Sequence, residues 1–249
     1  MNHKTQAAVL CGGRGERLKP LSDYFQKVMI PIGPKKLPLL IYILRLITGQ
    51  GIRRVALLTG YRSSDIRHYF GDGSHENVVL TYSEDQKERK GSLNAVAHAL
   101  KNGAISGCDE LLIYYGDVLT DLDITSLLAT HRRKRADATL VLARGYALPV
   151  GTAEVEKGGM VTAFREKPEL DISVTTGCML VGPKAMALIR KLASAKNTDL
   201  MTHFLPQLLR GGGKVASFYT DKEWFDVGTV SSFEKLNDEL SRHPLAYLV

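Results

Sequence analysis

The chain has 249 residues, 44% of them hydrophobic and 24% charged, which suffices for one large α/β domain with a sizeable core. Lys and Arg number 33 against 26 Asp and Glu, and the resulting net charge of +7 favours anionic partners. Three widely separated cysteines, no secretion signal and no apolar run of the roughly 18 residues needed to span a membrane indicate a cytoplasmic protein without membrane contact.

One dense basic run, His131 to Arg135, ends a predicted helix, where its charge complements the helix dipole and is expected to face solvent. No aromatic residues are interleaved with it, so nucleic-acid binding is not expected.

Apolar strands and amphipathic helices alternate through the first half of the chain. The spacing predicts strands at 7–10, 54–60, 78–82 and 110–115, and helices at 37–49, 63–70, 92–100 and 124–134. Ser63 or Ser64 is expected near the start of the second helix, and Asp123 as the N-cap of the fourth. This βαβα order predicts an α/β fold with an open, mostly parallel mixed sheet and helices on both faces.

The second half is richer in strands. Its pattern predicts strands at 138–143, 152–156, 161–164, 174–181 and 214–219, with a hairpin turn at Gly158-Gly159, and helices at 184–193, 199–209 and 232–240. No linker separates it from the first half. We therefore expect a single domain over 1–249, with halves at about 1–136 and 137–249, and the apolar helix faces leave a homo-oligomer open.

A glycine-rich loop follows the first predicted strand. Gly12, Gly13 and Gly15 stand at the carboxyl end of that strand, where backbone N–H groups can approach a polyphosphate closely. It is not a Walker A loop, because no Lys-Ser/Thr pair follows the last glycine, and Leu18 stands where a dinucleotide fingerprint needs its third glycine. The planar guanidinium of Arg17 suits phosphate oxygens.

The segment resembles the signature of the sugar nucleotidyltransferase family, G-G-x-G-x-R-L-x-P-L-T followed by P-K-x-x-x-P. The chain matches it at Gly12, Gly13, Gly15, Arg17, Leu18, Pro20, Leu21, Lys27 and Pro31. Ser22 replaces a threonine. Gln26 replaces a proline, so we expect the backbone before Lys27 to be less constrained. The resemblance implies a Rossmann-like fold in which Leu10, the three glycines and Arg17 bind a nucleoside triphosphate.

Two aspartates are candidates for binding Mg²⁺. Asp117 follows a predicted central strand, and Asp226 lies in a W-F-D-V-G-T segment that resembles the family's W-x-D-x-G-T. The family resemblance implies that both hold the metal, which neutralises charge in phosphoryl-type transfer. Asp121-Leu122-Asp123 also matches the D-x-D of metal-dependent nucleotide-sugar glycosyltransferases, but Asp123 is already expected to cap a helix.

Further matches concern the base and the sugar. Gln86, Gly91 and Ser92 fall where the family contacts the nucleobase, although Arg89-Lys90 replace a Pro-Leu pair. An F-x-E-K-P match places Glu166 against sugar hydroxyls and Lys167 against the incoming phosphate, and Gly151 falls where the sugar packs on bare backbone. Thr176-Gly177 resembles a sugar-binding segment whose usual asparagine is absent, so sugar recognition there is expected to differ.

The resemblance thus implies a nucleotide-binding first half and a sugar-phosphate-binding second half. The expected reaction transfers a nucleoside monophosphate from a nucleoside triphosphate to a hexose or heptose 1-phosphate by Mg²⁺-assisted in-line displacement. Arg17, Lys27, Asp117 and Lys167 are the expected catalytic residues. A glycosyltransferase and a non-catalytic nucleotide-sugar-binding relative remain as alternatives, and neither the base nor the sugar is identified.

Overall fold

The computed structural model describes residues 4–86, 88–148, 150–193 and 198–242. Its strands are β1 (Thr5–Cys11), β2 (Pro31–Ile32), β3 (Leu37–Pro38), β4 (Arg54–Thr59), β5 (Val79–Glu84), β6 (Glu110–Tyr115), β7 (Val118–Thr120), β8 (Ala138–Ala147), β9 (Thr152–Val155), β10 (Val161–Arg165), β11 (Glu169–Val181), β12 (Val215–Tyr219) and β13 (Trp224–Asp226). Its helices are α1 (Leu21–Tyr24), α2 (Leu39–Gly49), α3 (Ser63–Phe70), α4 (Ser92–Lys101), α5 (Ile124–Lys134), α6 (Pro183–Leu192), α7 (Leu205–Arg210) and α8 (Val230–Arg242). Short 3-10 turns η1 (Glu16–Leu18), η2 (Lys27–Met29) and η3 (Ser74–Glu76) and a π-helical turn η4 (Leu200–Phe204) complete the described elements.

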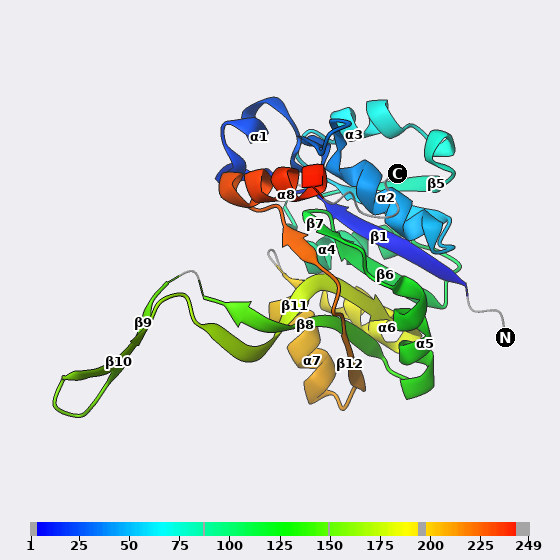
Figure 1. The fold of residues 1–249 in the computed structure, drawn as a ribbon. Helices are drawn as coiled ribbons and strands as arrows, with labels where there is room; N and C mark the ends of the chain where they lie inside the picture. The colour runs from blue at the N-terminus through cyan, green and yellow to red at the C-terminus, as the bar shows by residue number, and fades with distance from the viewer. Residues whose placement is uncertain (1–3, 87, 149, 194–197, 243–249) are drawn as a thin grey trace.

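A seven-stranded sheet in the order β12-β8-β11-β6-β1-β4-β5 forms the centre of the molecule (Figure 1). Of these seven described strands, β11 alone runs antiparallel to its neighbours. The predicted mostly parallel mixed sheet is therefore confirmed. Because β11 pairs with β6, one sheet continues from the first half of the chain into the second.

Helices cover both faces of the sheet, as predicted. Side chains alternate along β1, so Ala7 and Val9 join one hydrophobic cluster and Ala8 joins the other. The first cluster packs against α2, α3, α5 and α8, and the second against α4, α6, η4 and α7. This sandwich leaves the carboxyl ends of the parallel strands as the edge where ligands bind in open α/β sheets.

Some predicted boundaries are wrong for local reasons. The predicted helix over 199–209 splits into η4 and α7, because Pro206 has no N–H with which to continue the regular ladder. The helix predicted from 37 begins at Leu39, since the two preceding residues pair with β2. Other details agree with the predictions: Ser63 is the first residue of α3, directly after the N-cap Arg62, and Asp123 caps α5 by accepting the N–H of Ser126 at 2.8 Å.

The basic run at the end of α5 is exposed from Arg132 to Arg135, as predicted, and departs from the prediction at His131. The buried His131 ring hydrogen-bonds the hydroxyl of Thr139 at 2.8 Å, and Arg132 donates two hydrogen bonds to Glu110 at 2.7 and 2.6 Å. The helical period turns these two side chains toward β6 and β8. Burial lowers the pKa of His131, which favours the neutral ring.

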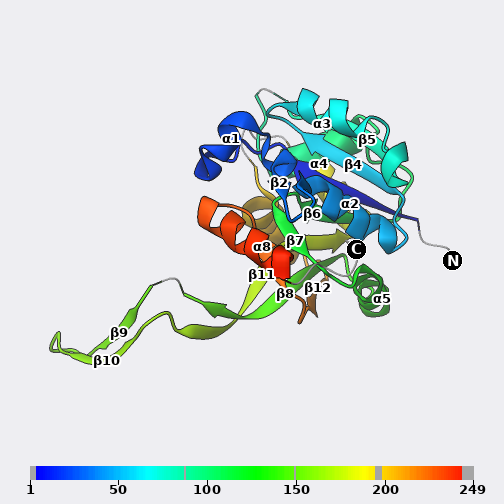
Figure 2. The ribbon, with the colours of Figure 1, turned by 45° about the horizontal axis from the view of Figure 1, so that its top comes forward.

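β9 and β10 form a hairpin arm that projects away from the rest of the molecule in both views (Figures 1 and 2). Its turn includes Gly158 and Gly159 as predicted, with the N–H of Gly159 donating to the carbonyl of Glu156. Within the described ranges, no helix is long and apolar enough to cross a membrane.

Candidate active site

Three neighbouring cavities, each lined by described residues, open at the carboxyl ends of β1 and β6. The loop cavity, about 380 Å³, includes Gly13, Gly15, Arg17, Lys27 and Asp117. The Gln86 cavity, about 520 Å³, is shared by the glycine loop and the start of α4, and its lining includes Leu10, Gly12, Gly13, Asp85, Gln86, Gly91 and Ser92. The Thr176 cavity, about 350 Å³, includes Asp117, Thr176, Gly177, Trp224 and Asp226.

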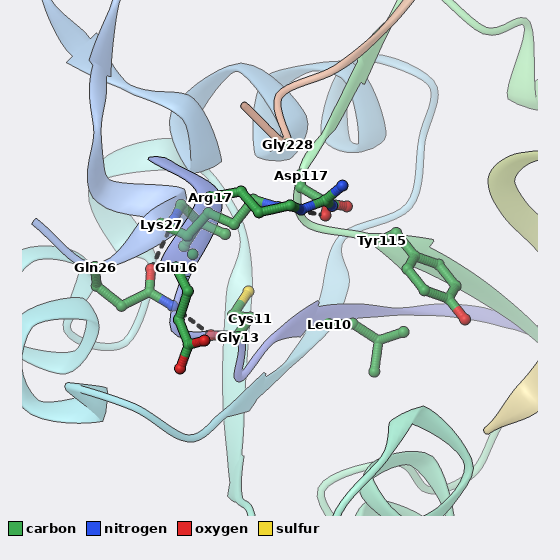
Figure 3. A pocket seen from close by; sticks show the side chains of 12 residues that line it. Leu10, Cys11, Gly13, Glu16, Arg17, Gln26, Lys27, Tyr115, Asp117 and Gly228 are labelled. Atoms are coloured by element: carbon green, nitrogen blue, oxygen red, sulfur yellow. Dashed lines mark hydrogen bonds and ion pairs between the residues drawn. The ribbon is translucent and has the colours of Figure 1, made fainter. Parts of the chain in front are cut away.

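The glycine loop turns back on itself beside Lys27. Gly15 has a positive φ of 67°, and a Cβ there would lie 3.3 Å from the Lys27 Cβ and 3.4 Å from that of Ser22. The N–H of Leu18 donates to the carbonyl of Gly15 at 2.8 Å, and the buried Leu18 side chain anchors the turn. Arg17 therefore reaches into the same cavity as Lys27 (Figure 3).

Gln26 fixes the backbone before Lys27, contrary to the expectation that loss of the family's proline loosens it. The fully buried side chain donates from Nε2 to the carbonyl of Cys11 at 2.5 Å, and its Oε1 accepts the N–H of Val28 at 2.7 Å (Figure 3). These bonds join η2 to the end of β1. The sequence interpretation missed this positioning role because it rests on contacts 15 residues apart.

Lys27 and Asp117 form an ion pair. The Lys27 Nζ lies 2.6 Å from an Asp117 carboxylate oxygen, and the two side chains are 12% and 30% exposed. Asp117 follows Gly116, whose N–H donates to the carbonyl of Leu10 at 3.0 Å. A Cβ on Gly116 would lie 2.6 Å from that carbonyl, so only glycine allows the two strand ends to approach this closely.

Asp226 lies beside Asp117 because β13 pairs antiparallel with β7. Asp226 is the register partner of Val118, and the N–H of Val227 donates to the Asp117 carbonyl at 2.8 Å. Burial first, and then the negative charge of Asp117, raises the pKa of Asp226.

The Asp226 carboxylate and the Arg17 guanidinium both lie close to Gly228. A Cβ on Gly228 would lie 3.0 Å from an Asp226 carboxylate oxygen and 3.2 Å from an Arg17 guanidinium nitrogen. The positive charges of Lys27 and Arg17 offset part of the rise in the pKa of Asp226. Two cations and two carboxylates are thus assembled at the junction of the loop cavity and the Thr176 cavity.

The two carboxylates fit a divalent cation that shares its ligands with a substrate. Among the described residues there is no cluster of three or more His, Cys, Asp or Glu side chains that would enclose a metal alone. Mg²⁺ commonly takes one or two carboxylates and completes its coordination with phosphate oxygens and water. Asp117 and Asp226 match that donor set. Asp121 and Asp123 line none of the three cavities, and the Asp123 carboxylate is occupied as a helix cap.

The Gln86 cavity ends at the start of α4. Gly91 has a φ of 102°, and a Cβ there would collide with the carbonyl of Thr198, so this close crossing of two backbone segments requires glycine. The Ser92 hydroxyl donates to Asp199 Oδ2 at 2.6 Å and accepts the N–H of Leu200 at 2.9 Å. The Ser92 side chain therefore ties α4 to η4, which leaves its backbone as the group to face a ligand.

An irregularity in β11 shapes the Thr176 cavity. The β8–β11 register shifts between Thr175 and Met179, and Gly177 has a φ of 77°. A Cβ on Gly177 would lie 3.0 Å from Val118 and 3.3 Å from Tyr115. The buried Thr176 hydroxyl donates to the carbonyl of Val141 at 3.2 Å, so it is occupied within the sheet. Asp199 and Trp224, which the sequence interpretation did not select as site residues, also line this cavity.

The remaining candidates lie at the base of the arm. A Cβ on Gly151 would lie 2.9 Å from a carboxylate oxygen of Glu166, so these two positions are close to each other. Glu166 and Lys167 are exposed, and Lys167 has a φ of 47°. Neither residue lines any of the three cavities.

Comparison with known proteins identifies relatives along the whole chain. It is 31% identical over 247 residues to mannose-1-phosphate guanylyltransferase from Mycobacterium tuberculosis, covering 96% of this chain and 66% of that protein. It is 28% identical over 256 residues to UTP–glucose-1-phosphate uridylyltransferase from Synechocystis sp., covering 95% and 64%. The chain thus spans just under two thirds of the length of these relatives.

A solved structure and a family profile agree with this relationship. HddC from Yersinia pseudotuberculosis shares the fold, with a TM-score of 0.73 and 19% identity over 95% of this chain and 99% of that one. The profile described as Nucleotidyl transferase matches residues 6–243. The chain therefore belongs to the Nucleotidyl transferase family.

Proposed function

We propose that the chain transfers a nucleoside monophosphate from a nucleoside triphosphate to a sugar 1-phosphate. The single observation that carries this proposal is the Lys27–Asp117 ion pair with Arg17 and Asp226 close by, at the end of a glycine loop. Family membership and the relatives named above support the reaction class. Their names differ in both base and sugar, so neither is carried over to this chain.

The reaction is a direct displacement at phosphorus. A phosphate oxygen of the sugar 1-phosphate attacks the α-phosphorus of the nucleotide. The bond from that phosphorus to the oxygen bridging to the β-phosphate breaks, and its electron pair leaves with pyrophosphate. The attacking phosphate is already ionised at neutral pH, so no protein nucleophile is required and positioning and electrostatics supply the rate.

Each cavity receives one part of the substrates. The base and ribose occupy the Gln86 cavity, with Leu10, Gln86, Gly91 and the backbone of Ser92 against them. The triphosphate enters the loop cavity, where backbone N–H groups of Gly12, Gly13 and Gly15 and the Arg17 guanidinium hold the leaving phosphates. The sugar phosphate occupies the Thr176 cavity beside Gly177. These placements follow the adjacency of the cavities, which share Leu10 or Asp117.

Lys27 stabilises negative charge at the α-phosphate, because its ammonium lies at the boundary of the phosphate and sugar cavities. Asp117 and Asp226 would hold Mg²⁺, which when bound neutralises charge on phosphate oxygens. Glu166, Lys167 and Gly151 belong to the sugar-phosphate side, and their place on the projecting arm requires the arm base to approach the Thr176 cavity when the substrate binds.

The decisive measurement is pyrophosphate release with Mg²⁺, testing UTP, GTP, dTTP and CTP against glucose, mannose and N-acetylglucosamine 1-phosphates. Release that requires one nucleotide and one sugar phosphate together supports the proposal. Hydrolysis of an added nucleotide sugar without any pyrophosphate chemistry would support the glycosyltransferase alternative instead. Nucleotide binding without release from any pair would favour the non-catalytic relative.

A further inference from the structure

A carboxylate that the reaction does not use lies in the Gln86 cavity. Asp85 directly follows β5, and its N–H donates to the carbonyl of Thr59 at 2.7 Å, which fixes the residue at the strand end. Its side chain sits against bare backbone. A Cβ on Gly60 would lie 2.6 Å from Asp85 Oδ2, and one on Gly12 would collide with the same oxygen. Two glycines thus make room for this carboxylate beneath the glycine loop.

Direct contacts with the described residues do not offset the partial burial of the Asp85 carboxylate. It accepts no hydrogen bond from any residue in the described ranges, and no ion pair holds it there. Among neighbouring charges, Glu84 opposes its ionisation and Lys90 favours it. Burying a carboxylate without protein donors costs free energy that its remaining hydration offsets only in part, and a ligand that supplies donors would offset the rest. Its place in a cavity of about 520 Å³ makes that ligand the base of the bound nucleotide.

The hydrogen-bonding edges of the bases differ in what they offer a carboxylate. Guanine presents two adjacent donors, N1–H and the exocyclic N2 amine, which can form two parallel bonds to the two carboxylate oxygens. Uracil and thymine present one N–H between two carbonyl oxygens, which a carboxylate repels. Adenine and cytosine each place an amine donor beside an acceptor ring nitrogen. Guanine alone matches both oxygens.

We propose that Asp85 is the residue that selects the base, and that it selects guanine, so the nucleotide substrate is GTP. This inference rests on the proposed function, since it assigns the base of the same nucleotide. Leu10 supplies an apolar surface for the ring, while Gly12, Gly60 and Gly91 keep the surrounding backbone close. Asp85 is a specificity residue that touches substrate and takes no part in the displacement.

The test compares GTP with ITP, whose base lacks only the exocyclic amine. Equilibrium binding by calorimetry with Mg²⁺ needs no knowledge of the sugar. Wild-type protein is expected to bind GTP about tenfold or more tightly than ITP, and also more tightly than UTP, dTTP, CTP and ATP. In Asp85→Asn the GTP-to-ITP ratio is expected to fall to about one, because the amide presents one donor and one acceptor.

Glu88→Gln is the matched control, since this exposed carboxylate lies in the same loop and lines none of the three cavities. It is expected to keep the wild-type ratio. Wild-type preference for UTP, dTTP, CTP or ATP, or an unchanged ratio in a folded Asp85→Asn protein, would overturn the role of Asp85 while sugar-dependent pyrophosphate release still upheld the proposed function. Folded wild-type protein that binds no nucleotide and releases no pyrophosphate would overturn both.

Discussion

The ammonium of Lys27 and the carboxylate of Asp117 lie 2.6 Å apart, although 90 residues separate them in the chain. The pair joins the turn after the glycine loop to the end of the central strand β6. A phosphate entering between them would compete with Asp117 for the ammonium and leave that carboxylate to a cation. Without substrate, each charge therefore keeps the other neutralised and in place.

Replacing Lys27 by Met tests the catalytic half of this pair. The variant keeps an unbranched stem but removes the ammonium, so kcat/KM should fall by an amount equivalent to about 2–4 kcal/mol of transition-state stabilisation. Steady-state pyrophosphate release measures this fall in kcat/KM. Lys19→Met is the control, because the ion pair of Lys19 with Asp23, at 3.7 Å, is exposed to solvent. Near-wild-type turnover by Lys27→Met would remove Lys27 from the mechanism.

Gln26 offers a test of how Lys27 is positioned. Gln26→Ala leaves the Cys11 carbonyl and the Val28 N–H without their partner and should cost about 1–3 kcal/mol of unfolding free energy, with a lower kcat. Gln26→Pro loses the same bonds, but the native φ of −65° is the value that proline fixes. Because the proline ring restricts the unfolded chain, Gln26→Pro should recover about 0.4–1 kcal/mol of unfolding free energy relative to Gln26→Ala. If chemical denaturation shows that the Gln26→Pro protein is less stable than the Gln26→Ala protein, this account is contradicted.

The alternation of strands and helices was readable from the sequence because each element buries one face and so repeats apolar residues at its own period. The strand 110–115 and the helix 124–134 were predicted with the bounds they have. The interpretation failed where distant contacts decide the local structure. The π-turn before Pro206 and the hydrogen bonds from Arg132 to the buried Glu110 depend on neighbours that periodicity does not identify.

The candidate site was predictable where motif and topology agree. Arg17, Lys27, Asp117 and Asp226 come together because the ends of β1, β6 and β13 meet at one edge. Gln26 and Asp85 were not selected, since a glutamine in place of a proline and an aspartate after a strand carry no local signal. Their roles arise from partners or cavities that only the folded chain brings to them.

The Asp226→Asn variant tests whether Asp226 binds Mg²⁺. Removing one carboxylate should raise the Mg²⁺ concentration at half-maximal activity by about tenfold or more, a scale typical of altered metal sites. The free protein should be no less stable, because Asp117 opposes ionisation of Asp226 in the fold. Metal titrations of activity and thermal unfolding without metal give the two results. An unchanged titration would assign Asp226 a structural role.

Gly91→Ala tests the crossing beneath the Gln86 cavity. The new methyl group would collide with the Thr198 carbonyl and must also adopt a φ of 102°, so a loss of about 2 kcal/mol or more in unfolding free energy is expected. Gly51→Ala is the control, because its φ of 90° imposes similar strain where nothing lies within 4 Å. Equal losses in the two variants would show that the contact with Thr198 contributes nothing.

The partial burial of Asp85 leads to a prediction about the free energy of unfolding that does not depend on any ligand. Burial, followed by the charge of Glu84, raises the pKa of Asp85 to about 6, against about 3.9 in an unfolded chain. The folded protein binds this proton more tightly than the unfolded chain does. The stability that the raised pKa confers is present below about pH 4 and is lost as the pH rises through about 6. Above pH 6 the ionised carboxylate therefore carries its full burial penalty.

Asp85→Asn removes that penalty and should stabilise the nucleotide-free protein at pH 8. Because the carboxylate lines an open cavity and is partly hydrated, the gain should be on the order of 1 kcal/mol. At pH 4 the variant and wild type should unfold at the same denaturant concentration, and Glu88→Gln should show no such pH dependence. A variant less stable than wild type at pH 8 would mean that Asp85 is held by favourable contacts within the protein. If Asp85→Asn is more stable than wild type at pH 8 and has lost its selectivity for GTP, the Asp85 carboxylate destabilises the free protein and recognises the substrate.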